Sequence, residues 1–398
     1  MTDNKLEDRR RFLKGGAALG LAAAAARSAQ ADPGDHELSR SAYGERSTFV
    51  TSTRISDGGN NCSFGSDCNT LSPIQDQVGI ITPSALHFNS SHGATPPDID
   101  PDRHELLIHG LVQRPLKFTM AELKRLPFVS HIHFIECSAN YPLPVDVTVQ
   151  HTHGKTSCSE WTGVPLSILL NEAGVRGNAK WIVAEGADRD FHSKSIPLER
   201  ALGSCYLAYG QNGEPLRPHQ GFPLRLMVPG AGGFSHVKWL QRIKVVDKPY
   251  LTPSERFNPL HGPKSVVTFP SGGQRLEGPG FYTISGLAWS GGGRISTVEV
   301  STDGGRRWQR AELKGPVLPI AHTRFALGWR FDGKPATIMS RCTDETGEVQ
   351  PTATEFAAAR GVGVDRVLAR EVRRQGQWNL VFPWRVNGDG SVEHHLWA

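Results

Sequence analysis

Short stretches in which apolar and polar residues alternate recur from about residue 83 onward, with a few helix-like stretches between them. A period of two indicates a strand with one buried face, whereas apolar residues three or four apart indicate a helix. The pattern predicts helices at 120–126 and 165–173, the second of which ends at Gly174. It predicts strands at Glu105–His109, Lys180–Ala184, Phe222–Val228 and Val237–Val246.

The last third of the chain has a different texture, because its alternating stretches are short and are separated by turn residues at regular intervals. Asp303, Gly304 and Gly305 predict a hairpin turn between two of these stretches. Short strands with regular turns are typical of a β-sandwich. The predicted strands are Phe281–Trp289, Ile295–Ser301, Trp308–Leu313, Thr323–Phe331 and Thr337–Thr343.

Changes in composition divide the 398 residues into segments. Residues 32–82 are rich in Ser, Gly, Asn and Asp and predict a loosely structured segment. Strands and helices alternate at 83–250, and proline and glycine then mark a linker at 251–265. The β-sandwich occupies 266–398. The predicted fold class is therefore α+β, a mixed α/β domain followed by a β-sandwich.

The first 31 residues have the features of an export leader. Arg9, Arg10 and Arg11 precede a mildly apolar stretch, and 29–31 (Ala-Gln-Ala) resembles a signal-peptidase site. The paired arginines favour a twin-arginine signal, which exports folded proteins, over an ordinary secretory signal. We therefore expect a periplasmic protein that acquires a cofactor before export. No other hydrophobic stretch approaches the length of a membrane span, so the mature chain is expected to have none.

The charge pattern gives no indication of a nucleic-acid partner. The formal net charge is +5, and the leader contributes more than half of it. Outside the leader no basic cluster is interleaved with aromatic residues. We expect no nucleic acid to bind.

The chain has six cysteines. Cys62 and Cys68 flank a small polar loop and form either a local disulfide or two free thiols. No Cys-x-x-Cys-His sequence occurs, so we expect no haem on this chain.

Cys137 ends an apolar, strand-like stretch and begins a polar loop, a position from which a thiolate can reach a metal. Two His-x-His pairs, at 131–133 and 151–153, and Cys158 lie nearby in the sequence. These residue types suit zinc or copper. The alternative is hydrogen-bonding histidines at strand ends and, for Cys137, a buried inert thiol.

A second group of candidate residues lies between 206 and 239. Arg225, His236 and Lys238 bring positive charge next to glycine-rich turns at Gly221 and at 229–233. Glycine allows the backbone to approach a ligand, and Arg and Lys bind phosphate. The alternative is a hairpin with surface cations.

Five motifs occur in order along the chain. They are 136–140 (ECSAN), 160–166 (EWTGVPL), 207–213 (LAYGQNG), 221–230 (GFPLRLMVPG) and 237–242 (VKWLQR). Together they resemble the molybdopterin domain of the sulfite oxidase family, in particular the bacterial sulfite and sulfane dehydrogenases. The later segments 298–305 and 343–351 resemble the family's immunoglobulin-like dimerisation domain. The resemblance covers roughly residues 83–360.

The resemblance implies a molybdopterin cofactor and makes Cys137 the thiolate ligand of molybdenum. It also implies positions that contact the pterin or hold its phosphate. These are Phe88, Ser90, His92, Asp188, Gln220, Arg225, His236, Val237 and Lys238.

The sequence departs from the family's pattern at two positions near the implied metal. Ser90 stands where the family commonly has an arginine, and 253–260 contains Phe257 but no tyrosine. Arg360 matches an arginine that the family's second domain directs toward the substrate, so it is the candidate anion-binding residue.

The resemblance implies oxidation of sulfite, a small sulfur oxyanion, or of carrier-bound sulfane sulfur. Without its own haem, the chain is expected to pass electrons to a separate c-type cytochrome, and the second domain is expected to form a homodimer. Two alternatives remain. One is a molybdopterin-dependent reductase of an oxidised sulfur or nitrogen compound. The other is a non-catalytic subunit that docks a cytochrome or sulfur carrier.

Overall fold

The computed structural model describes residues 46–56, 69–91, 95–143, 147–188, 192–250, 260–373 and 376–395. Residues 52–398 form one compact unit, and residues 1–51 belong to another. No helix in the described ranges is long and apolar enough to cross a membrane. The predictions about the leader, Cys62, Cys68, His92 and Phe257 concern residues outside these ranges.

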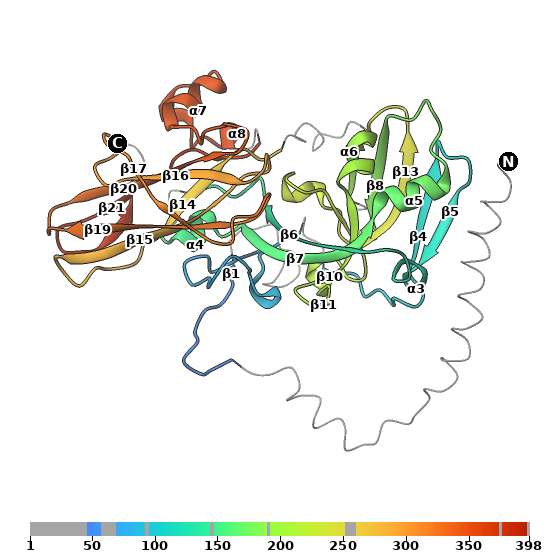
Figure 1. Ribbon diagram of the computed structural model, residues 1–398, viewed down its shortest axis with the longest axis horizontal. Helices are drawn as coiled ribbons and strands as arrows, with labels where there is room; N and C mark the ends of the chain where they lie inside the picture. The colour runs from blue at the N-terminus through green and yellow to red at the C-terminus, as the bar shows by residue number, and fades with distance from the viewer. Residues whose placement is uncertain are drawn as a thin grey trace, which may run out of the picture. The chain divides into compact units, whose positions relative to one another are not determined.

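The first domain contains a five-stranded mixed sheet in the order β5-β4-β13-β8-β9. β13 runs parallel to β4 and antiparallel to β8. The helices α5 (Leu166–Ala173) and α6 (Leu198–Gly203) lie against this sheet (Figure 1). The strands are β4 (Glu105–Gly110), β5 (Leu116–Thr119), β8 (Trp181–Gly186), β9 (Ser193–Pro197) and β13 (Leu240–Val246).

The strands predicted at 105–109, 180–184 and 237–246 are confirmed as β4, β8 and β13, with shifted ends. The helix predicted at 165–173 is confirmed as α5, and Gly174 ends it in the left-handed conformation with φ 70°. The helix predicted at 120–126 is shorter, since α3 covers Met120–Leu123. Thr119 and Glu122 start it with a reciprocal capping box.

A second five-stranded sheet carries the cysteine motif. Its order is β11-β10-β7-β6, and β12 also pairs with β10. The strand predicted at 222–228 is confirmed only over its centre, as β12. Helix α4 (Val149–His153) lies between β6 and β7 in the sequence. The strands are β6 (Val129–Glu136), β7 (Thr156–Pro165), β10 (Tyr206–Gln211), β11 (Glu214–Pro215) and β12 (Arg225–Met227).

A small three-stranded sheet lies within the segment predicted to be loosely structured and just beyond it. Its strands are β1 (Ile55–Ser56), β2 (Asn69–Leu71) and β3 (Asn89–Ser90). A 3-10 turn at Ser84–Leu86 precedes β3. Because β3 pairs with β2, Asn89 and Ser90 belong to a sheet and not to a free loop.

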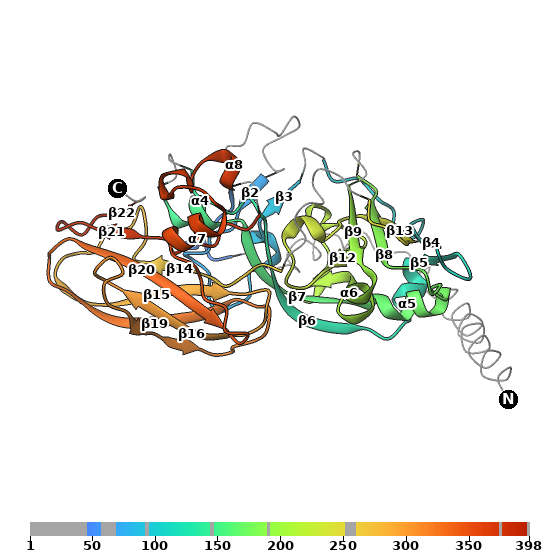
Figure 2. The ribbon, with the colours of Figure 1, turned by 90° about the horizontal axis from the view of Figure 1, so that it is seen from above.

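The C-terminal domain is the predicted β-sandwich, with sheets in the orders β14-β15-β19-β18 and β17-β16-β20-β21-β22 (Figure 2). The first sheet contains β14 (Lys264–Phe269), β15 (Gly280–Trp289), β18 (Glu312–Lys314) and β19 (Thr323–Phe331). The second contains β16 (Ile295–Ser301), β17 (Gln309–Arg310), β20 (Ala336–Asp344), β21 (Trp384–Val386) and β22 (Val392–His394).

Two sequence predictions in the sandwich need correction. The strand predicted at 308–313 is two strands in different sheets, because β17 pairs with β16 while β18 pairs with β19. The linker predicted at 251–265 is too long at its end, because β14 already begins at Lys264. The turn at Asp303 is confirmed, and its carboxylate accepts the backbone N–H groups of Arg306 and Arg307.

A short helical segment interrupts the sandwich between β20 and β21, where the sequence pattern predicted no particular element. It contains α7 (Ala353–Ala359), a 3-10 turn (Val364–Arg366) and α8 (Arg370–Arg373). Phe356, Val367 and Val372 attach it to the core of the sandwich. This segment therefore presents its polar side chains from a fixed support.

Strand β7 contributes to both large cores of the molecule, and β6 contributes to the core of the sandwich. Phe134 and Cys158 belong to the core of the sandwich, whereas Val164 belongs to the core of the first domain. The backbone N–H of Phe134 also donates to the carbonyl of Ile320 at 2.9 Å. The loop that follows β6 is consequently supported by both domains.

Candidate active site

Cys137 is the first residue after β6, and its backbone is fixed on both sides. Its N–H donates to the carbonyl of Lys155, and its own carbonyl accepts the N–H of Asn140, each at 2.9 Å. The half-buried thiol accepts the N–H of Ala139 at 3.5 Å and lies 3.7 Å from the hydroxyl oxygen of Ser90. These contacts hold the thiol beside Ser90 at the start of the polar loop.

Glu136, which precedes Cys137, is fully buried and accepts hydrogen bonds from both domains. One carboxylate oxygen accepts from Lys264 at 2.7 Å and from Asn140 at 2.9 Å. The other accepts from His261, Trp289 and Gln377. Burial by itself would raise the pKa of Glu136, but Lys264 and His261 outweigh it and hold the pKa well below its usual range.

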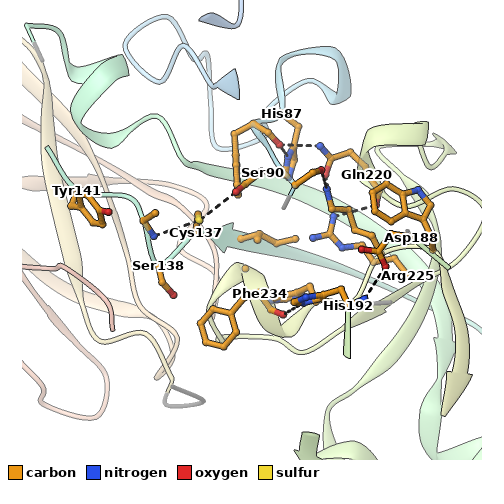
Figure 3. Close-up of a pocket in the computed structure, with 18 of the residues that line it drawn as sticks. His87, Ser90, Cys137, Ser138, Tyr141, Asp188, His192, Gln220, Arg225 and Phe234 are labelled. Atoms are coloured by element: carbon orange, nitrogen blue, oxygen red, sulfur yellow. Dashed lines mark hydrogen bonds between the residues drawn. The ribbon is translucent and has the colours of Figure 1, made fainter. Parts of the chain in front are cut away.

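A cavity of about 580 Å³ lies next to Cys137. Figure 3 shows Cys137 between Tyr141 on one side and Gln220, Asp188 and Arg225 on the other. The sequence-predicted residues that line it are Phe88, Ser90, Cys137, Asp188, Gln220, Arg225, His236 and Lys238.

Lys238 brings an ammonium group to the cavity. Its Nζ donates to Asn89 Oδ1, Ser91 Oγ and the carbonyl of His219, at 2.9–3.1 Å. Burial and the nearby charge of Arg225 lower the pKa of Lys238 to about 7. A bound anion would reverse this shift, because it would favour the charged form.

Arg225 is the second cation on this side of the cavity. Its Nη1 donates to the carbonyl and to the side-chain oxygen of Gln220, at 3.2 and 3.1 Å. Its Nε is buried and has no hydrogen-bond partner among the described residues. Burial lowers the pKa of Arg225 to about 9. Asp188 is the only carboxylate in the described lining, so this side is short of negative charge.

Two buried histidines flank these cations and are both neutral. His236 donates from Nε2 to the carbonyl of Ala231 and accepts the N–H of Val228 at Nδ1. His87 donates from Nδ1 to the carbonyl of Phe88, which leaves Nε2 as an acceptor with no partner in the described chain. Burial lowers the pKa of His87 to about 3 and that of His236 well below its ordinary value.

The turn after β8 places Asp188 in the cavity wall. Asp188 accepts the backbone N–H of His192 at 3.0 Å, and His192 Nε2 donates to the carbonyl of Phe234 at 2.9 Å. Gly186 permits the close packing behind this turn, since a Cβ there would lie 2.6 Å from the carbonyl oxygen of Lys238. The polar wall around Lys238 is thus packed tightly from behind.

Tyr141 and Arg373 line the side of the cavity beyond Cys137, and sequence reasoning missed both. The guanidinium of Arg373 lies over the ring of Tyr141, 4.7 Å from its centre, and donates to the carbonyl of Pro142 at 3.2 Å. Tyr141 directly follows the 136–140 motif, which was a usable signal. Arg373 had none, because only the tertiary fold brings α8 to Cys137. Sequence reasoning also missed His87, His192 and Phe234, which line the cavity.

Two predicted site residues are not in the lining and need correction. Arg360 ends α7, where its guanidinium lies over the ring of Phe356 and donates to the carbonyl of Gln377 at 2.9 Å. Val237 is fully buried in the core of the first domain, and its carbonyl accepts the N–H of Leu226 at 2.8 Å. His92 lies outside the described residues.

The His-x-His pairs do not form a metal cluster in the part of the chain that the structure describes. His131 and His133 stack on one face of β6, and His133 bonds the hydroxyl of Tyr206 at 3.0 Å. The second pair is on helix α4 and not on a strand, so His151 is exposed while His153 packs against aromatic rings in the core.

Comparison with known proteins agrees with this arrangement. Residues 92–254 match the oxidoreductase molybdopterin binding domain, and residues 262–364 match the Mo-co oxidoreductase dimerisation domain. The crystal structure of the sulfane dehydrogenase SoxCD from Paracoccus pantotrophus matches with a TM-score of 0.78 and 36% identity, over 87% of this chain and 91% of that one.

Curated relatives include the mitochondrial sulfite oxidase of Rattus norvegicus, 31% identical over 71% of this chain and 59% of that protein. Nitrate reductase [NADH] 1 of Arabidopsis thaliana is 33% identical over 69% of this chain and 36% of that protein. The chain therefore spans about three fifths of the sulfite oxidase and about a third of the nitrate reductase. The family-model matches and the SoxCD similarity establish that the chain belongs to the sulfite oxidase family of molybdopterin oxidoreductases.

Proposed function

We propose that this chain is a periplasmic molybdenum enzyme that oxidises sulfite or carrier-bound sulfane sulfur, with Cys137 as the protein ligand of the metal. The main observation in support is the position of this thiol, which is rigidly held in the lining of a cavity with cations along one side. When bound, the molybdenum cofactor supplies two-electron redox chemistry and oxygen-atom transfer. The similarity to a sulfane dehydrogenase and to sulfite oxidases supports a sulfur substrate.

The charged side of the cavity fits a cofactor that carries a phosphate. Arg225 and Lys238 both have pKa values lowered by burial, and Arg225 Nε has no partner among the described residues. A phosphate would supply the acceptors and the negative charge that this side lacks. The unpartnered Nε2 of His87 would accept a hydrogen bond from a ring N–H donor. Phe88, Ser90, Asp188, Gln220 and His236 complete the proposed cofactor contacts, with His92 carried over from the resemblance.

The remaining parts of the proposal concern location and partners. The leader at 1–31 supports export of the folded protein to the periplasm. Electrons would pass to a separate c-type cytochrome, since no haem-attachment sequence occurs. The match to a dimerisation domain supports a homodimer, which light scattering of the purified protein would test.

The decisive experiment compares the native protein with the Cys137→Ser variant. Purified native protein is expected to contain about one molybdenum and one pterin per chain and to reduce cytochrome c with sulfite. The serine variant is expected to lose the sulfur ligand and nearly all activity, because an alcohol oxygen is a poorer donor to a soft metal site. Unchanged activity and metal content in the variant would contradict the assignment of Cys137.

A second candidate function keeps the cofactor and reverses the reaction. The 33% identity to nitrate reductases favours a reductase of an oxidised nitrogen or sulfur compound. The uncharged Ser90 near the thiol also departs from the sulfite-oxidising pattern. Reduction of nitrate or a sulfoxide by the molybdenum-loaded protein with a viologen donor, without sulfite oxidation, would favour this function over the first.

A further inference from the structure

The side of the cavity at Tyr141 carries the positive charge of Arg373, which has no carboxylate partner among the described residues. We infer that Tyr141 and Arg373 bind a small sulfur oxyanion there, on the side of Cys137 away from Arg225. The inference rests on the proposed function, because it takes this oxyanion to be the substrate of that enzyme. It assigns the anion-binding role to Arg373 in place of Arg360.

Arg373 has unused hydrogen-bonding capacity. Nη1 donates to the carbonyl of Pro142, but Nε is buried and has no hydrogen-bond partner within the described ranges. A buried N–H without an acceptor is costly, so an acceptor supplied at this wall by a ligand or by an ordered water would be favourable.

The arginine also lacks a counter-ion among the described residues. Arg341 offers a comparison, because it too lies over an aromatic ring, that of Trp308 at 4.4 Å, yet it pairs with Glu299 at 2.8 Å. Arg366, on the same helical segment as Arg373, pairs with Glu371. Of these three arginines, only Arg373 lines the cavity, and only Arg373 has no carboxylate beside it in the described chain.

The groups at this side select an anion with several acceptor oxygens. A guanidinium presents a planar set of N–H donors that matches two oxygens of an oxyanion. Figure 3 shows the hydroxyl of Tyr141 turned toward Cys137, where it can donate to a third oxygen. The only carboxylate in the described lining, Asp188, lies on the opposite side of Cys137 and does not compete.

The support of Arg373 is rigid enough for a specificity role. Val372 is 2% exposed and anchors α8 in the core of the sandwich, and the N–H of Arg373 donates to the carbonyl of Ala369 at 3.0 Å. Tyr141 packs against the same core. Ser90 places no charge beside the thiol, so the cation comes from the second domain instead.

The test measures the KM for sulfite and the inhibition constant of sulfate. The proteins compared are the native protein, Arg373→Met, Arg373→Lys and Tyr141→Phe. Arg373→Met is expected to raise the KM for sulfite and the inhibition constant of sulfate by roughly 10- to 100-fold, the effect of one lost charged contact. The kcat is expected to change less than KM. Lysine is expected to restore part of the loss, and Tyr141→Phe to raise both constants by a few-fold. Sulfate titration by calorimetry on the same preparations tests the site even where sulfite is not turned over.

Arg366→Met is the matched control, because it removes a paired arginine from the same segment and is expected to leave both constants unchanged. Urea midpoints confirm that each variant is folded. If Arg373→Met does not fold, Arg373→Lys is used in its place to test the anion site. Unchanged sulfate affinity in folded Arg373→Met, or a larger effect from Arg360→Met, overturns the inference. Absence of molybdenum or of sulfite oxidation in native protein contradicts the proposed function instead, while the sulfate titration still decides the anion site.

Discussion

The carboxylate of Glu136 and the ammonium of Lys264 lie 2.7 Å apart with both side chains withdrawn from solvent. Glu136 directly precedes Cys137, whereas Lys264 opens the first strand of the sandwich. Nζ of Lys264 also donates to the carbonyl of Asn140 at 2.8 Å. The second domain thereby holds both ends of the loop that presents the thiol.

Removing the ammonium is expected to destabilise the protein strongly. Lys264→Met leaves the carboxylate of Glu136 buried without its charged partner, which costs about 3–5 kcal/mol of unfolding free energy. Urea denaturation measures the loss. The exposed pair Lys117–Glu105 has the same 2.7 Å separation, so Lys117→Met is the matched control and is expected to cost about 0–1 kcal/mol. Equal losses in the two variants would contradict the dominant role of burial.

Stability is expected to fall in mild acid because buried histidines are neutral in the folded state. Burial lowers the pKa of His322 to about 3, and its Nε2 bonds the hydroxyl of Thr156 at 3.0 Å. Below about pH 6.5 the unfolded chain binds the proton first, so His322 alone costs about 1.4 kcal/mol per pH unit down to about pH 3. Above pH 6.5 it has no effect.

Urea midpoints between pH 7 and 4.5 measure this slope. His322→Gln is expected to lower the unfolding free energy at pH 7. Its unfolding free energy is also expected to depend less steeply on pH, by the contribution of about one proton. His151→Gln is the control, because His151 is exposed. The prediction is wrong if stability depends on pH as steeply in the His322 variant as in the native protein.

Gly221 is expected to matter for cofactor retention as well as for folding. It has φ 105°, and a Cβ there would lie 3.0 Å from Cα and Cβ of Lys238. Gly213 also has a positive φ, 79°, but a Cβ there meets nothing within 4 Å. Both alanine variants are therefore expected to lose about 1–2 kcal/mol of stability.

Only Gly221→Ala is expected to lower the molybdenum and pterin content, because only this variant displaces Lys238. Metal analysis of both variants, purified under the same conditions, separates the two effects. Equal retention of the cofactor in the two proteins would show that the contact with Lys238 is not needed.

Arg225→Met is expected to weaken cofactor binding more than it weakens the fold. Loss of one buried charged contact costs ~2–5 kcal/mol, or roughly 30- to 4,000-fold in affinity. Pterin released per chain after dialysis measures this. Arg242→Met removes an arginine that pairs with Glu185 at the surface, so it is the control and is expected to retain the cofactor.

Local patterns in the sequence were sufficient for most of the fold. The alternation at 295–301 predicted β16 with its observed ends, and Gly174 predicted the end of α5. The pattern failed where neighbours in space decide the outcome. Residues 308–313 alternate like one strand, yet two partners in different sheets divide them.

The sequence by itself determined the family and most of one side of the cavity, because Cys137, Arg225 and Lys238 lie in contiguous motifs whose local backbone places them. Only the tertiary structure decided the other side. Arg373 reaches the cavity because α8 is packed on the sandwich core, while Arg360 is turned away onto Phe356. Arg373 and Tyr141 are more than 200 residues apart in the sequence, and no local propensity predicts a contact between them. It follows from burial of the apolar side chains of α8 and of Tyr141 against the core of the sandwich.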